Sequence, residues 1–238
     1  MKKNEFNSEF WEKYFKVYDI LNLCIPYIKL KEEFIKYTDP RSKDKILDAG
    51  GGTGNIGIEL YRKGADVIIL DFSKEALAIC RQKETNIKTM HADLSEPLQF
   101  SDNFFDKIIS NNVLYTIPKE KRNKIFKEFN RILKPGGKII ISNIKKGFNP
   151  AVIYKEHVFD SIFKDGFCKT FSIIFKMIYP TLKMFYYNSL IKKAEKHNKY
   201  SFLEQFDQEA LLKNNRFKIL LSKIIYANQA VISVAEKI

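Results

Sequence analysis

The stretch that decides the fold is DAGGGTGNIG, residues 48–57. Counted from Asp48 it has the form Asp-x-Gly-x-Gly-x-Gly, whereas counted from Gly52 it has the form Gly-x-Gly-x-x-Gly, which is typical of a dinucleotide-binding turn. The two frames predict ligands of opposite charge. The first puts a carboxylate beside the ligand and suits a cation, and the second points helix N–H groups at a pyrophosphate.

Around this stretch, strands and helices alternate along the chain. Apolar runs without strict polar alternation are typical of parallel strands that helices cover on both faces. Two more β-rich runs in residues 216–238 indicate an antiparallel edge hairpin. We therefore expect an α/β fold: a Rossmann-like, doubly wound, mainly parallel seven-stranded sheet with a C-terminal antiparallel edge hairpin and a helical cap insertion. The parallel strands are predicted at residues 45–50, 66–71, 87–93, 105–112 and 138–143.

Asp48 decides between the two frames of the glycine turn. It lies at the end of the first predicted strand, where an ionised carboxylate would repel a pyrophosphate a few residues away. Gly50 also begins the turn directly after this strand, whereas Gly52 comes two residues later. Asp71, at the end of the second strand, does not discriminate, because ribose hydroxyls bind such an acid in both ligand classes. The sequence therefore favours a cationic ligand, and a molecule with an amino group and a sulfonium would suit this acid.

Five segments together resemble the class I S-adenosylmethionine-dependent methyltransferases, over roughly residues 43–145. Residues 11–21, WEKYFKVYDIL, are in addition similar to the Tyr-Asp lid helix of the quinone-biosynthesis and phospholipid methyltransferase branch. The five segments are ILDAGGGTG (46–54), the acid of IILDFS (68–73), the acid of MHADLSEPLQFSDNFFD (90–106), SNNVLYTIP (110–118) and EFNRILKPGGKIIIS (128–142).

The resemblance implies a site for S-adenosylmethionine, with each residue facing one part of the methyl donor. The methionine end is expected at the glycine turn and the start of the following helix, under a lid residue. The ribose and adenine are expected at the ends of the second and third strands, and the sulfur at the end of the fourth. In that order the residues are Asp48, Gly50, Gly52, Gly54, Asn55 and the lid Tyr18; Asp71 for the ribose; Phe72, Asp93 and Leu94 for the adenine; and Ser110 and Asn111 near the sulfur.

The sequence holds no obvious catalytic cluster, and methyl transfer does not require one. The sulfonium is an activated leaving group, so the protein chiefly positions the nucleophile, and a base is needed only if that nucleophile must lose a proton early. His157, Tyr18 and Tyr115 are the weak candidates for a base, and many relatives of the family carry a histidine where Tyr115 stands. No metal site and no disulfide framework is expected from three scattered cysteines.

Residues 146–200 interrupt the alternation of strands and helices, and their composition bears on which molecule accepts the methyl group. From residue 145 to 200 there are eleven lysines and four acids, out of a net charge of +13 for the chain. Aromatic residues recur at every fourth position from Phe159 to Tyr179, and Gly166 and Pro180 are expected to break the segment into separate helices. The aromatic residues either pack onto the domain, line an apolar tunnel, or form a membrane-facing surface with lysines at its rim.

These observations predict a cytoplasmic methyltransferase that acts on a small, hydrophobic, lipid-like or quinone-like acceptor, with peripheral contact to an anionic membrane as a further expectation. An RNA methyltransferase, favoured by the charge alone, and a non-catalytic S-adenosylmethionine-binding protein are the alternatives. The expected divisions of the chain are N-terminal lid helices at 1–40, a donor-binding core at 41–145, a helical substrate-cap insertion at 146–204, and a C-terminal helix and hairpin at 205–238.

Overall fold

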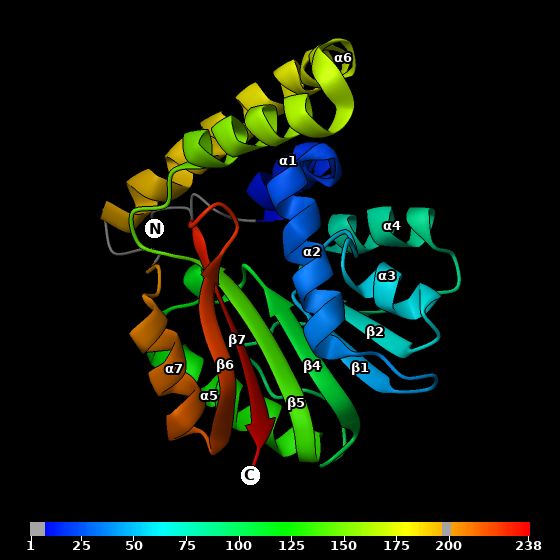
Figure 1. Ribbon diagram of the computed structural model, residues 1–238. Coiled ribbons are helices and arrows are strands. Elements are labelled where there is room, and N and C mark those ends of the chain that lie inside the picture. Colours follow the sequence, from blue (N-terminus) through cyan, green and yellow to red (C-terminus); the bar gives the residue numbers. More distant parts are fainter. Residues whose placement is uncertain (1–7, 197–200) are drawn as a thin grey trace.

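The computed structural model describes residues 8–196 and 201–238 of the chain. Its centre is a seven-stranded sheet in the order β3-β2-β1-β4-β5-β7-β6, in which β7 runs antiparallel to both of its neighbours (Figure 1). The expected Rossmann-like sheet with an antiparallel edge hairpin is thereby confirmed. The strands are β1 (Lys45–Ala49), β2 (Asp66–Asp71), β3 (Lys88–His91), β4 (Phe105–Asn111), β5 (Leu133–Ile144), β6 (Phe217–Ile225) and β7 (Ala230–Lys237).

Helices cover the sheet and extend beyond its carboxyl edge. Helix α2 packs on β4 and β5, α3 and α4 pack on β2, and α7 packs on β6 and β7. Helices α1 and α6 lie beyond the carboxyl ends of the parallel strands (Figure 1). The α-helices are α1 (Ser8–Tyr18), α2 (Ile25–Thr38), α3 (Gly57–Arg62), α4 (Lys74–Lys83), α5 (Lys119–Ile132), α6 (Pro150–Lys196) and α7 (Gln205–Asn214), and the short 3-10 helices are η1 (Asp19–Leu23) and η2 (Leu114–Thr116).

The register of the strands brings the candidate functional residues together at one edge of the sheet. Asp48 of β1 pairs with Ile69 of β2 on one side and with Ile109 of β4 on the other. Since these strands are parallel and end close to one another, the acids near the ends of β1 and β2 and the polar residues that end β4 converge at one edge of the sheet. This is the edge at which ligands bind in open α/β sheets.

Local sequence explains where several helices begin. The hydroxyl of Ser73 accepts a hydrogen bond from the N–H of Ala76 at 3.1 Å and caps α4, as the sequence indicates. Pro26 comes directly after the interruption between α1 and α2, as the helical spacing of this part of the sequence predicts. It lies in the first turn of α2, where its missing N–H costs nothing, so it marks the start of that helix.

Helix α6 is bent once, at Gly166, whose φ of 76° and ψ of 169° interrupt the helical backbone. The second predicted break, at Pro180, is wrong, because Pro180 stays inside the helix. The bend turns α6 into two helical arms that run above α1 and the strand ends (Figure 1). Among the described helices, none is both long enough and apolar enough to span a bilayer.

Candidate active site

The turn after β1 holds the carboxylate of Asp48 inside the protein. Gly50, Gly52 and Gly54 have φ angles of 76°, 56° and 78°, which residues with a Cβ rarely adopt. Asp48 is 2% exposed, and its Oδ2 accepts a hydrogen bond from the N–H of Gly57 at 3.1 Å. A Cβ on Gly57 would lie 2.7 Å from that oxygen. Gly57 therefore belongs to the Asp48 site and not to a dinucleotide motif.

Burial changes the charge state of Asp48. Desolvation of the carboxylate raises the pKa of Asp48 to about 7, with a smaller contribution from the nearby Asp71. The simple expectation of a fully ionised acid at this position therefore needs refinement, because the ligand-free side chain is half protonated near neutral pH. A cation placed beside Asp48 favours the ionised form and draws the proton off. Cation binding and proton release are thus coupled at this residue.

Asp71 ties the glycine turn to the loop after β2. One of its oxygens accepts from the N–H of Gly52 at 2.9 Å, and the other accepts from the N–H of Ser73 at 2.8 Å. Burial raises the pKa of Asp71 to about 6, and the backbone hydrogen bonds oppose this shift. Each carboxylate oxygen has two acceptor positions, so Asp71 retains capacity for ligand hydroxyls.

Beside Asp71 lies the first of two cavities, here called the outer cavity. Four predicted residues, Asp71, Phe72, Asp93 and Leu94, line it together. The ring of Phe72 is 43% exposed, so a flat ligand can stack on it. One oxygen of Asp93 accepts from the N–H of Ser95 at 2.8 Å, which fixes the carboxylate at the end of the loop.

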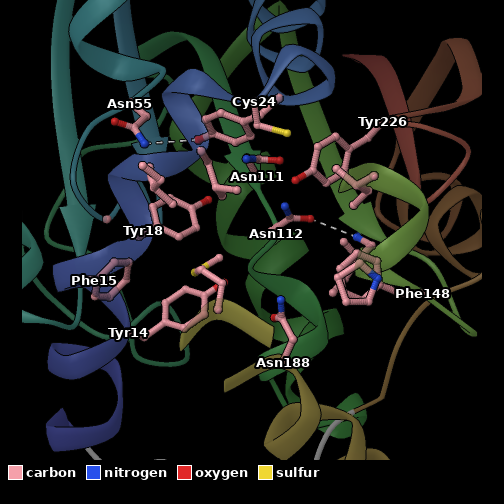
Figure 2. A pocket seen from close by; sticks show the side chains of 18 of the residues that line it. Tyr14, Phe15, Tyr18, Cys24, Asn55, Asn111, Asn112, Phe148, Asn188 and Tyr226 are labelled. Carbon is pink, nitrogen blue, oxygen red and sulfur yellow. Dashed lines mark hydrogen bonds between the residues drawn. The ribbon is translucent and has the colours of Figure 1, made fainter. Parts of the chain in front are cut away.

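The second cavity, here called the inner cavity, lies between the glycine turn and the underside of α6. Figure 2 shows Tyr18, Asn55 and Asn111 facing it from different elements. The outer and inner cavities meet at Gly50 and Asn112, which line both. A single elongated ligand can therefore reach from one to the other. The predicted residues that line the inner cavity are Tyr18, Asp48, Gly50, Gly52, Asn55, Asn111 and Tyr115.

The segment that carries Tyr18 is fastened to the glycine turn by polar contacts. Asp19 accepts from the Thr53 hydroxyl at 2.7 Å and from the Lys83 ammonium at 3.0 Å. The same ammonium donates to Asn55 Oδ1 at 2.7 Å, and Asn22 donates to that oxygen at 3.0 Å. Asn55 thus holds the lid segment in position in addition to lining the cavity. This network escaped the sequence analysis, because its partners lie more than 25 residues apart.

Two predicted binding residues do not reach either cavity. The hydroxyl of Ser110 donates to the backbone oxygen of Ala49 at 2.9 Å, which joins β4 to β1. Gly54 lies behind the turn, where a Cβ would meet the sulfur of Cys80 at 2.6 Å. Both residues support the shape of the turn, and neither lines the cavities described here.

Each of the three weak base candidates lacks either the position or the ionised form that a base needs. The side chain of His157 is buried between α6 and α2, where its Nδ1 accepts from the N–H of Ile25 at 3.3 Å and burial lowers its pKa. It does not line the inner cavity. Tyr18 and Tyr115 do line it, but burial raises the pKa of each phenol further above its usual value. At neutral pH both phenols are protonated and are hydrogen-bond donors.

Several lining residues of the inner cavity had no signal in the sequence. Asn112 has a φ of 59°, and its Oδ1 accepts a hydrogen bond from the N–H of Ile144 at 3.0 Å. This bond holds the side chain at the junction of the two cavities (Figure 2). Tyr226 comes from the hairpin turn between β6 and β7, where three successive residues have positive φ. The second arm of α6 adds Met177, Thr181, Met184 and Asn188. No cluster of three or more metal-ligating side chains occurs among the described residues.

Comparison with known proteins relates the sequence and the fold to methyltransferases. A family model for the methyltransferase domain matches residues 46–137. A demethylmenaquinone methyltransferase of Bacillus cereus is 27% identical over 215 residues, which cover 85% of this chain and 80% of that protein. Two solved structures share the fold. The complex of the Haloferax volcanii Trm112 methyltransferase activator with a methyltransferase gives a TM-score of 0.66 at 13% identity, covering 97% of both chains. The geranyl diphosphate C-methyltransferase of Streptomyces coelicolor, solved with S-adenosyl-L-homocysteine, gives a TM-score of 0.61 at 12% identity, covering 88% of this chain and 79% of that one.

The chain is a class I S-adenosylmethionine-dependent methyltransferase, and S-adenosylmethionine is its methyl donor. The observed residues fit this donor. Two joined cavities accommodate an elongated molecule, buried carboxylates lie at the ends of β1 and β2, and glycines leave room for backbone contact.

Proposed function

We propose that the chain transfers the methyl group to an apolar, quinol-like acceptor that occupies the inner cavity beneath α6. The donor in this proposal spans both cavities, with its adenosine in the outer cavity and its amino-acid end against the glycine turn. Asp71 accepts from the ribose hydroxyls, Phe72 and Leu94 enclose the adenine, and Asp93 accepts from its amino group. Tyr18 covers the methionine end.

The observation that supports this class of acceptor is the lining of the inner cavity. Apart from the glycine turn, its wall is largely aromatic and aliphatic, with side chains from α1, η1 and α6. A charged or strongly hydrated acceptor would lose its solvation there without compensation. A flat ring with an apolar tail gains from the same burial. The demethylmenaquinone methyltransferase relatives, at 27–28% identity, point to the same class of acceptor.

A small number of polar atoms would orient the acceptor ring. The Oδ1 of Asn111 is buried and has no hydrogen-bond partner among the described residues, so it offers an acceptor for a ligand hydroxyl. The phenol of Tyr18 stays protonated and can donate to an oxygen that gains negative charge. The protein would then hold the nucleophilic atom in line with the methyl group.

The donor supplies a methyl group on a positive sulfur, which departs as a neutral thioether with the bonding electron pair. The chain's own contribution is to orient the two substrates and to exclude water from between them. A quinol that gives a hydroxyl proton to solvent before the transfer carries a negative oxygen, which the fixed donors of the cavity stabilise. That charge is neutralised as the bond to the methyl carbon forms, so no side-chain base is needed.

The test measures transfer of labelled methyl from S-adenosylmethionine to a demethylmenaquinol with a short isoprenoid tail. Asn111→Leu is expected to lower kcat/KM about 10- to 100-fold, as expected for loss of a hydrogen bond to a buried polar group. The volume-conserving Met184→Leu, in the same cavity, is the control and should stay within a few-fold. Methylation of tRNA, or of a polar acceptor without a tail, in preference to the quinol would overturn the proposed acceptor class.

A further inference from the structure

The outward side of α6 exposes an unusual amount of apolar surface. Phe163 and Phe167, on either side of the bend at Gly166, are 76% and 73% exposed. Single exposed apolar residues are common, but a continuous row on one element marks an interaction site. The other large apolar residues of α6 that are exposed are Val152, Phe159, Ile162, Phe171, Phe175, Ile178, Tyr179, Leu182 and Tyr186.

The second arm of α6 is apolar on two opposite sides. Phe171, Phe175, Ile178, Leu182 and Tyr186 follow one another at intervals of four, three, four and four residues, so they share one face of the helix. The opposite face contains buried residues, and part of it forms the roof of the inner cavity. A surface helix of a water-exposed protein normally has one polar face. The outward face of this arm is therefore suited to a second apolar environment. We refer to it as the apolar face.

Positive charge flanks the apolar face. Lys169, Lys176 and Lys183 are exposed and are spaced by seven residues, which brings them back to nearly the same side of the helix. From residue 167 to residue 191 the sequence contains these three lysines and no acid, and the ammonium of Lys169 pairs with Asp165, one turn earlier, at 2.6 Å. The ammonium of Lys183 lies 4.7 Å from the ring centre of Tyr179, so the basic row directly adjoins the aromatic residues.

We propose that α6 docks on the surface of an anionic phospholipid bilayer, with its apolar face in the interfacial region and its lysine row on the headgroups. Aromatic and leucine side chains beside lysines are the composition of helices that lie in a membrane interface. Anionic headgroups complement the lysines, whereas a second copy of the chain would bring the same lysines and another net charge of +13 to the contact. The charge therefore favours lipid over a second copy of the chain.

Docking in this orientation connects the bilayer with the inner cavity. Met177, Met184 and Asn188 of the same arm line the cavity on the side opposite the apolar face. An acceptor with a lipid-soluble tail would then pass from the membrane around a single helix to reach the methyl donor. This part of the inference rests on the proposed function, but the docking itself does not.

The test is co-sedimentation of the full chain with vesicles of equal parts phosphatidylglycerol and phosphatidylcholine, compared with phosphatidylcholine alone. We expect binding to the mixed vesicles that Phe171→Ser/Phe175→Ser weakens at least tenfold, because both side chains are more than half exposed and their loss removes interface contact. The control is Phe206→Ser on α7, which removes an even more exposed phenylalanine away from the apolar face and should bind like the wild type. Lys169→Gln/Lys176→Gln/Lys183→Gln should lose most of the preference for phosphatidylglycerol.

Two further measurements distinguish a loss of membrane docking from damage to the active site and from a change in oligomeric state. S-adenosylmethionine affinity should be the same in all of these variants, and light scattering should show the same mass for the wild type and the Phe171/Phe175 variant. Equal vesicle binding by that variant and the Phe206 control would overturn the inference. A dimer that dissociates in the Phe171/Phe175 variant, without vesicle binding by the wild type, would instead assign the apolar face to a second copy. If vesicle binding behaves as expected while the quinol is not methylated, only the proposed acceptor falls.

Discussion

Replacing Asp48 by asparagine is expected to stabilise the ligand-free protein and to weaken its binding of S-adenosylmethionine. The two side chains have nearly the same shape, and the asparagine oxygen can still accept from the N–H of Gly57, which lies 3.1 Å from the aspartate oxygen. The substitution therefore removes the ionisable group with little change in packing. The difference in stability between the two proteins therefore reports the free energy of keeping a charge in a buried site.

The effect on stability follows from the pKa of Asp48, which burial raises from 3.8 to about 7. Because the folded protein has the higher pKa, this group's contribution to stability is fully present below about pH 4 and is lost as the pH rises through 7. With 1.36 kcal/mol for each pKa unit, the loss is about 4 kcal/mol in full, of which about 3 kcal/mol falls between pH 5 and pH 8. The stability difference between Asp48→Asn and the wild type should widen by that amount over this range.

Urea unfolding of both proteins at pH 5 and pH 8, without ligand, measures this difference. Calorimetric titration then measures the affinity for S-adenosylmethionine, which should fall roughly 10- to 100-fold in the variant because a charge-assisted contact is lost. For the wild type, the ionised fraction of Asp48 rises about tenfold between pH 6 and pH 8, and affinity should rise with it. The variant should lack this part of the pH dependence. A stability difference that is the same at pH 5 and pH 8, or unchanged affinity in the variant, would refute the reasoning.

Two other substitutions test the rest of the donor site. Asp71→Ala should lower S-adenosylmethionine affinity about 100-fold in the same titration, because it removes the acceptor for the ribose hydroxyls, and unchanged affinity would remove Asp71 from the site. Gly54→Ala should cost about 1–3 kcal/mol more than Gly136→Ala in urea unfolding: both glycines have positive φ, of 78° and 70°, but a Cβ at Gly54 meets Cys80 at 2.6 Å whereas at Gly136 it meets open space. Equal costs for the two variants would show that the turn is not close-packed.

The sheet and the position of the site could be predicted from sequence because they depend on local patterns. Buried parallel strands need continuous apolar runs, and five such runs, most of them separated by helices, leave few alternatives for the topology. The acids at the ends of the first two strands then meet at one edge, whatever the details of the loops. Asp48 and Asp71 are both found there, buried and bonded to the glycine turn or to the helix start that follows it.

The finer details depend on contacts that sequence spacing does not specify. Ser110 and Asn111 are neighbours at the end of β4, but successive side chains of a strand point to opposite faces, and only Asn111 lines the inner cavity. Tyr226 reaches the cavity through a turn of three left-handed residues, none of them glycine. The four-residue spacing of aromatic residues from Phe159 to Tyr179 did not indicate which face of α6 packs on the protein, and all six of these residues are exposed.

The most direct test of the account is a crystal structure of the protein with S-adenosylhomocysteine, the product of methyl transfer, compared with a soak in NADH. We predict the adenine between Phe72 and Leu94, the ribose hydroxyls on Asp71, and the amino-acid end at the glycine turn beneath Tyr18. NADH in this crevice with S-adenosylhomocysteine absent, or the product bound outside the two joined cavities, would contradict it.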